Sequence, residues 1–202
     1  MARTASTGPL VRTLDCLLGI STRISRAGVW ACGALLFAAV AMIVIEIVLR
    51  AFGSSLHGAH ELSGYVLAIV TSWGLAWALI EKAHIRIDVI YMRVGPRLRT
   101  VLDLIAILMM ALFVVVLLSQ VWELVAGTLK RGSTANTPLQ TPLWIPQMLW
   151  MAGLVWFAFT VFVLAARTVL GALTGDRDAV ARVWGNRSIE EEIAENDHST
   201  RG

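Results

Sequence analysis

Four long apolar stretches dominate the sequence, and short polar segments separate them. Each stretch holds about 20 residues or more. A helix of that length, rising 1.5 Å per residue, crosses the roughly 30 Å hydrocarbon core of a bilayer. The pattern therefore predicts an all-α integral membrane protein with four transmembrane helices. The predicted spans cover residues 28–49, 62–80, 101–121 and 144–170.

The segment before the first span, residues 1–27, has a periodicity of its own. Its apolar positions between residues 10 and 24 recur at helical spacing, with Arg12 and Asp15 among the polar residues on the other side. We expect an amphipathic helix on the membrane surface that leads into the first span. A signal peptide is the alternative, but its apolar core, residues 14–20, would be short and would contain Asp15.

Two further polar segments border the predicted spans of the membrane domain, residues 28–170. After the second span, charged residues return abruptly at Glu81, and Asp88 stands where it can cap a short helix over residues 89–94. We expect this arm to lie in the membrane interface, because it is too polar to cross the bilayer. Residues 171–202 form a charged tail.

The composition favours a membrane protein and predicts its orientation. Charged residues make up 15% of the 202 residues and hydrophobic residues 57%, whereas a soluble domain has about 25% charged residues. The net charge of +3 does not indicate a nucleic-acid partner, because the basic residues flank apolar spans. Of the 17 Lys and Arg residues, fourteen fall on one side of the predicted membrane and three on the other. Both termini are therefore expected in the cytoplasm.

Three charged residues gather near the predicted outer side of the membrane. Glu46 and Arg50 are four residues apart near the end of the first span, so they can pair along the helix. Glu61 precedes the second span, where it could join that pair or favour a helix N-terminus. Two interpretations of Glu46 remain open: a carboxylate that carries protons or ions, or a structural partner of Arg50.

Small residues recur every four positions along the second span, which is typical of a helix face that another helix approaches closely. The partner helix can belong to this chain or to another protein. The residues are Gly64, Ala68, Ser72 and Ala76. In the interfacial arm, the polar side chains either face lipid headgroups or contact a partner protein. They belong to His84, Arg86 and Asp88.

The sequence contains no motif for catalysis, cofactor binding or a metal site. All four histidines lie outside the predicted spans, so a pair of axial ligands for a membrane haem is not available. The span interiors hold almost no ionisable residues and no unwound segment of the kind that a solute path needs. These features favour a membrane scaffold or accessory subunit over an enzyme or a complete transporter.

Several blocks of sequence resemble the small membrane subunit of the tripartite ATP-independent periplasmic (TRAP) transporters. Their order and spacing carry the likeness, which extends over residues 30–170 together with the four spans. The blocks are EIVLRAF at 46–52, ELSGY at 61–65, EKAHIRIDVIY at 81–91 and TPLWIPQMLWMAGL at 141–154.

The resemblance implies partners and a role in a bacterial inner membrane. The small subunit pairs with a large membrane subunit that carries the substrate and sodium sites, and a periplasmic binding protein delivers the solute, commonly a carboxylate. An ion gradient drives uptake, while the small subunit acts as a fixed frame. Carried over, the family's outer charged positions correspond to Arg50 and Glu61, and its inner motif corresponds to His84, Arg86 and Asp88.

Two other classes of protein are alternatives. The first is an independent small exporter that works as a homodimer, with Glu46 as its proton-carrying carboxylate. The second is a membrane anchor for a redox enzyme, against which the positions of the histidines argue.

Overall fold

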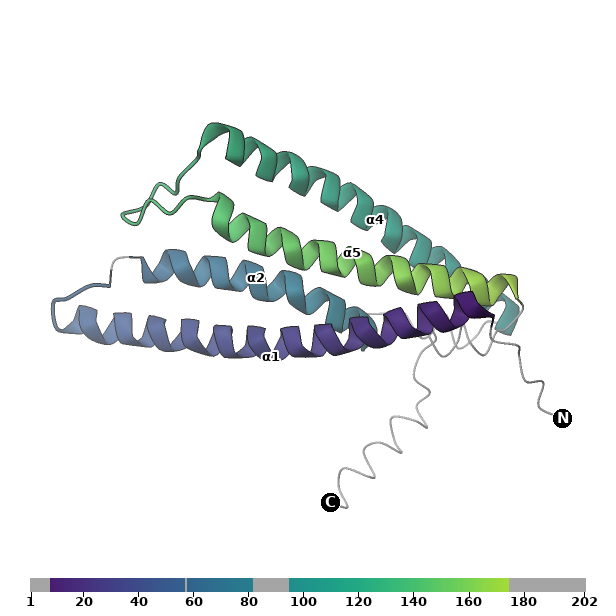
Figure 1. Ribbon diagram of the computed structural model, residues 1–202. Coiled ribbons are helices and arrows are strands. Elements are labelled where there is room, and N and C mark those ends of the chain that lie inside the picture. The colour runs from purple at the N-terminus through teal and green to yellow at the C-terminus, as the bar shows by residue number, and fades with distance from the viewer. Residues whose placement is uncertain (1–7, 57, 82–94, 175–202) are drawn as a thin grey trace, which may run out of the picture.

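The computed structural model describes residues 8–56, 58–81 and 95–174, and its helices form one elongated bundle (Figure 1). Within the described residues, four helices are long and apolar enough to cross a membrane. This confirms the all-α membrane class predicted from the sequence. The helices are α1 (Pro9–Ala51), α2 (Ala59–Ile80), α4 (Pro96–Arg131) and α5 (Trp144–Leu173).

The bundle has two distinct ends (Figure 1). At one end lie the connection from α1 to α2, residues 52–58, and the connection from α4 to α5, residues 132–143; we call this the loop end. At the other end α1 and α4 begin and α5 finishes, and we call this the termini end. The predicted arm helix over residues 89–94 and almost all of the predicted tail lie outside the described residues.

The first helix is longer than its predicted span. The segment over residues 10–24 is helical as predicted, and it continues without a break into residues 28–49, so both segments belong to one helix. The resulting helix has 43 residues and a length of about 65 Å, roughly twice the hydrocarbon thickness of a bilayer. Its first half stays helical because it packs along α5, where the hydroxyls of Ser21 and Thr160 form a hydrogen bond of 2.7 Å.

This contact between α1 and α5 is polar and antiparallel. Besides the Ser21–Thr160 bond, Trp156 Nε1 donates to Ser25 Oγ at 3.0 Å, and Ser25 is buried. Ser21 contacts Thr160 and Ser25 contacts Trp156, so residue numbers decrease along α5 as they increase along α1 and the two helices are antiparallel. In a membrane, such hydrogen bonds between helices are worth about 0.6–2 kcal/mol each.

The centre of the bundle is α5, which contacts α1, α2 and α4. Half of the most apolar window of α5 is buried, against 17% of the corresponding window in each other helix. The main core is formed where α2 and α4 pack on this helix. Its buried side chains include Ala76, Leu79, Ile107, Val114, Phe157 and Val161.

The helices α2 and α5 approach each other closely at Gly153. A Cβ atom at this position would lie 2.7 Å from Trp73 Cδ1 and even nearer to the hydroxyl of Ser72. The indole of Trp73 also donates a hydrogen bond to the carbonyl oxygen of Leu149 at 3.2 Å. A glycine is therefore needed here, because any side chain would push the two helices apart.

The third span is extended in a similar way. The helix α4 continues to Arg131, beyond the predicted end at residue 121, and Val125 and Thr128 are buried in this extension. Val125 belongs to a small cluster with Leu154 of α5. The helix stops at Gly132, whose positive φ of 59° gives the left-handed conformation that commonly ends a helix.

Replacing Gly153 with Ala tests whether this contact holds the bundle together. We expect the variant to lose about 1–3 kcal/mol of stability, because the added methyl group overpacks the contact with Ser72 and Trp73. Gly74→Ala is the matched control, since nothing lies within 4 Å of a Cβ at Gly74 and Ala is the better helix former. Thermal unfolding of both variants in detergent measures the difference. Equal melting temperatures for the two variants would contradict the proposed tight contact.

Candidate functional site

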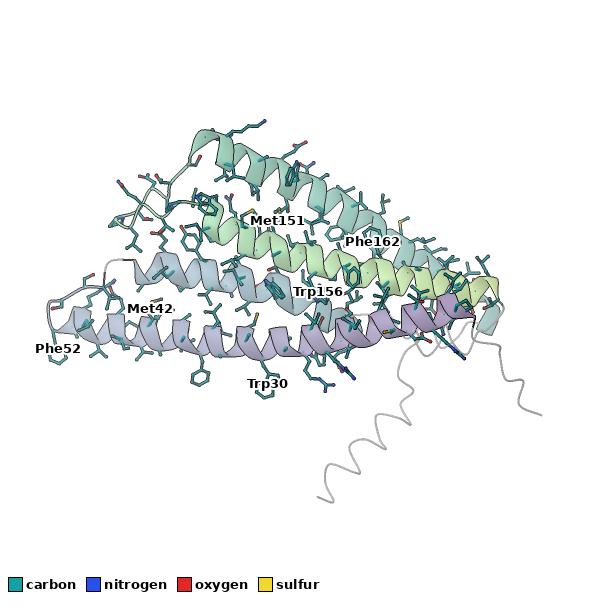
Figure 2. All side chains as sticks on the ribbon, viewed as in Figure 1. Trp30, Met42, Phe52, Met151, Trp156 and Phe162 are labelled. Atoms are coloured by element: carbon teal, nitrogen blue, oxygen red, sulfur yellow. The ribbon has the colours of Figure 1, made fainter. Side chains whose placement is uncertain are left out.

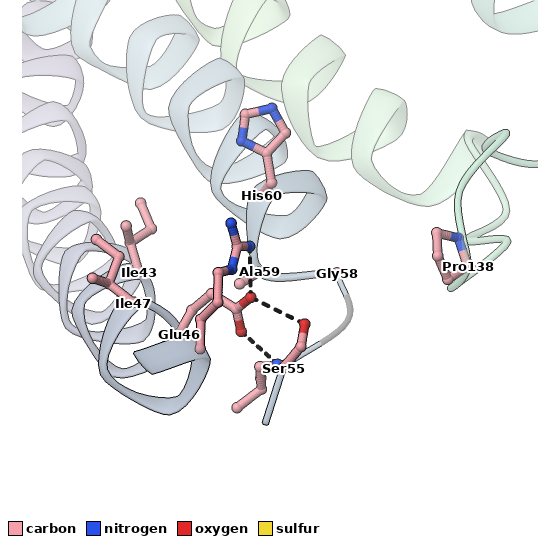
Figure 3. A pocket seen from close by; sticks show the side chains of 10 residues that line it. Ile43, Glu46, Ile47, Ser55, Gly58, Ala59, His60 and Pro138 are labelled. Atoms are coloured by element: carbon pink, nitrogen blue, oxygen red, sulfur yellow. Dashed lines mark hydrogen bonds and ion pairs between the residues drawn. The ribbon is translucent and has the colours of Figure 1, made fainter. Parts of the chain in front are cut away.

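The loop end contains two carboxylates, and each holds one of the two loops. Glu46, near the end of α1, accepts hydrogen bonds from Arg50 at 2.9 Å and from Ser55 Oγ at 3.3 Å. The same carboxylate accepts a short hydrogen bond from the backbone N–H of Leu56 (Figure 3). Glu46 therefore fixes the loop that connects α1 to α2.

The second carboxylate, Glu61, lies in the first turn of α2. It accepts a hydrogen bond from the phenol of Tyr65 at 2.7 Å and another from the hydroxyl of Thr137. Thr137 belongs to the loop between α4 and α5. The carboxylate therefore ties the start of α2 to a loop that is distant in sequence.

The two loops also meet each other directly at Gly58. This glycine has a φ of 110°, which L side chains rarely adopt. A Cβ at this position would lie 2.6 Å from Leu139 Cγ and nearer still to a methyl carbon of that side chain. The Leu139 side chain of the loop between α4 and α5 therefore packs directly against the backbone of Gly58 in the loop between α1 and α2.

A cavity of about 290 Å³ lies beside Glu46, lined by Ile43 and Ile47 on one side and by His60 and Pro138 among other residues (Figure 3). The carboxylate that borders it is already bound by donors of its own chain. The Arg50 side chain is 75% exposed, whereas that of Glu46 is 10% exposed. This arrangement can hold the loop in place, because Arg50, Ser55 and Leu56 all donate hydrogen bonds to the Glu46 carboxylate.

No metal site accompanies this cavity: the described residues hold no group of three or more His, Cys, Asp or Glu side chains that could bind a metal ion. Several buried polar side chains inside the bundle have partners within the protein. Thr160 and Thr168 donate to carbonyl oxygens of their own helix, and Asp103 makes an interaction as well. In the described part of the chain, one buried side-chain polar atom is without a hydrogen-bond partner, Gln147 Oε1.

The structure brings together some of the residues singled out in the sequence. Glu46 and Arg50 form the pair that their spacing suggests, while Glu61 binds its own set of partners at the other loop. His84, Arg86 and Asp88 lie outside the described residues.

The four small residues of α2 divide into two pairs. Ser72 and Ala76 are buried, Ser72 against Gly153 of α5 and Ala76 in the core. The other two, Gly64 and Ala68, are exposed. Of these four small residues, only the two in the second half of α2 pack against another helix of this chain.

Several polar contacts of the site were not predicted from the sequence. The bond between Glu61 and Tyr65 could have been found, because the two residues are four apart on a helix. The contacts of Glu46 with Leu56 and of Glu61 with Thr137 depend on the conformations of loops, for which the sequence gives no periodic signal.

Four packed helices, each long and apolar enough to cross a bilayer, define a multi-pass membrane protein. Comparison with known families agrees. Residues 39–172 match the DctQ component of the tripartite ATP-independent periplasmic transporters. This match covers well over half of the chain, which therefore belongs to that family of transporter components. No curated protein and no solved structure matches the chain.

Replacing Glu46 with Ala should release the loop between α1 and α2. The amide of Leu56 loses its acceptor, so we expect its hydrogen exchange to become at least about tenfold faster. Exchange of a peptide covering residues 53–58 can be followed by mass spectrometry. Arg50→Gln is the control: it removes the neighbouring charge but leaves the acceptor of the Leu56 amide, so protection should persist. Unchanged exchange in Glu46→Ala would contradict the assigned role.

Proposed function

We propose that this chain is the small membrane subunit that braces a large TRAP membrane subunit. In this assembly the complex takes up an organic acid or a related solute, driven by an ion gradient, after a periplasmic binding protein delivers the solute. Membership of the DctQ family supports the proposal. The buried hydroxyls of Thr160 and Thr168, which form hydrogen bonds within the protein, support a subunit that does not handle the solute itself.

The observation that carries the bracing role is the distribution of buried surface. Only α5 is half buried, while α1, α2 and α4 each leave most of their apolar windows uncovered. On α1 the Phe37 side chain is 81% exposed, and on α4 the Phe113 side chain is 58% exposed. Such faces can contact lipid and a second membrane protein. The helix α5 packs against α1, α2 and α4 and so holds these faces in place.

The proposed orientation places the termini end in the cytoplasm and the loop end in the periplasm of a bacterial cell. The excess of Lys and Arg in the segments that flank the termini end supports it. The solute arrives from the periplasm, so the loops held by Glu46 and Glu61 would face the side on which delivery takes place.

Native cysteines allow a direct test of this orientation. Cys16 is exposed near the termini end, whereas Cys32 is buried. A membrane-impermeant maleimide should therefore label the chain in inverted membrane vesicles and leave it unlabelled in intact spheroplasts. The Cys16→Ser variant should remain unlabelled in both. Labelling of Cys16 from the periplasmic side would reverse the proposed topology.

The bracing function is tested by co-expression with a cognate large TRAP subunit. We expect the two chains to co-purify, and deletion of this chain to abolish uptake of the solute that the cognate binding protein carries. Proteoliposomes containing this chain alone should show no transport above protein-free vesicles. Solute movement down an ion gradient in those vesicles would overturn the proposal.

An independent exporter is the second candidate, since Glu46 lies beside a cavity near the end of a span. Glu46→Gln separates the two functions. A bracing subunit should keep uptake within about twofold of wild type, because the amide oxygen of Gln can still accept a hydrogen bond from Leu56. A proton-coupled exporter would lose almost all activity, because Gln cannot ionise.

A further inference from the structure

A second hollow of the surface lies along the first half of α1. It is a shallow groove of about 520 Å³ whose lining consists entirely of residues from one segment of α1. Its residues are Gly19, Thr22, Arg23, Arg26, Ala27 and Trp30.

The groove follows from the spacing of small and large side chains along the helix. Gly19, Arg23, Arg26 and Trp30 are separated by four, three and four residues, so they share one face. Nothing lies within 4 Å of a Cβ at Gly19, which leaves the space beside Arg23 open. The Trp30 side chain is 77% exposed and points away from the bundle (Figure 2).

The contact with α2 places this groove at the edge of the membrane. The guanidinium carbon of Arg26 lies 5.5 Å from the centre of the Trp77 ring, less than one turn before α2 ends at Ile80. An apolar span ends where it leaves the hydrocarbon, so Arg26 lies at the level of the lipid headgroups. Trp30 lies one turn deeper, at the depth that interfacial tryptophans prefer.

The two arginines of the groove are not part of any ion pair among residues 8–56, 58–81 and 95–174. Within the described residues no carboxylate pairs with Arg23 or Arg26, although Arg167 at the same end binds Asp15 at 2.8 Å. Two cations on an open face, directly beside the headgroup layer, favour an anionic ligand.

We propose that this groove binds the headgroup of an anionic phospholipid. Arg23 and Arg26 would hold the phosphate oxygens through charge-assisted hydrogen bonds, and the Trp30 ring would lie against the glycerol region. The exposed apolar side chains deeper along α1, such as Phe37, would contact an acyl chain. A lipid fits better than an acidic protein segment, because the exposed surface of α1 changes from cationic at Arg26 to aromatic at Trp30 and then to apolar at Phe37, in the order in which a phospholipid changes from headgroup to glycerol to acyl chain.

This inference goes beyond the proposed transport role and does not rest on it. It requires only that the chain crosses a bilayer, and it holds for either orientation. The groove also lies outside residues 39–172, the part of the chain that matches the DctQ family.

Native mass spectrometry of the full-length chain in detergent tests the proposal. The protein is titrated with dioleoyl-phosphatidylglycerol and, separately, with dioleoyl-phosphatidylcholine. We expect tighter binding of the anionic lipid, and a loss of about tenfold or more in its affinity for the double variant Arg23→Gln/Arg26→Gln. The control, Lys130→Gln/Arg131→Gln, removes the same charge at the loop end and should change the affinity by less than about twofold.

Two additional variants distinguish a built site from general attraction. Arg23→Lys/Arg26→Lys keeps the charge and should retain most of the binding, while Trp30→Ala should weaken it about threefold or more. Melting temperatures confirm that each variant is folded. The proposal is overturned by equal affinity for the two lipids, by equal losses in both double Gln variants, or by displacement of the bound lipid when the large subunit or a peptide of residues 175–202 is added.

Discussion

The packing of α5 against its neighbours is the constraint on which the rest of this bundle depends. Helices already surrounded by hydrocarbon gain little from burying apolar side chains against each other, so close approach and hydrogen bonds must hold them together. The central helix supplies both. Gly153 lets α2 come close, while Trp156 and Thr160 bind the hydroxyl groups of two serines on α1. The positions of α1 and α2 are therefore set by particular side chains of α5.

This arrangement also limits what the bundle can do. Polar groups that line the contacts of α5 are used in the contacts themselves: the hydroxyl of Thr160 donates to its own helix and bonds Ser21, and that of Thr168 donates to Leu164. A solute path would need such groups to be free and the helices to separate around them. Because the interior is packed, the proposed contact with a large subunit falls to the apolar perimeter of α1, α2 and α4.

The sequence predicted the parts of the structure that the bilayer itself determines. The bounds of α2 and α5 lie close to the predicted spans, because hydrocarbon thickness sets their apolar length. The spacing of apolar residues predicted a helix over residues 10–24 but not its unbroken continuation into the first span. It gave no sign that α4 continues beyond residue 121, where contacts with α5 stabilise the extension. The Glu46–Arg50 pair follows from helical spacing alone. The bonds from Ser55 and Leu56 to the same carboxylate depend on the conformation of a loop, which no local pattern specifies.

Polar interactions fix the helix ends at both ends of the bundle, but they differ in kind. At the loop end, the carboxylates of Glu46 and Glu61 each accept hydrogen bonds from loop atoms, and ionised acceptors form the stronger kind of hydrogen bond. At the termini end, the ion pair of Asp15 and Arg167 joins α1 to α5. A carboxylate that carries protons across a membrane must be reached in turn from both sides, whereas Glu46 lies under donors of its own loop. In the proposed role, the contacts that cover Glu46 also keep the helix ends in place, and a frame against which another subunit moves requires fixed helix ends.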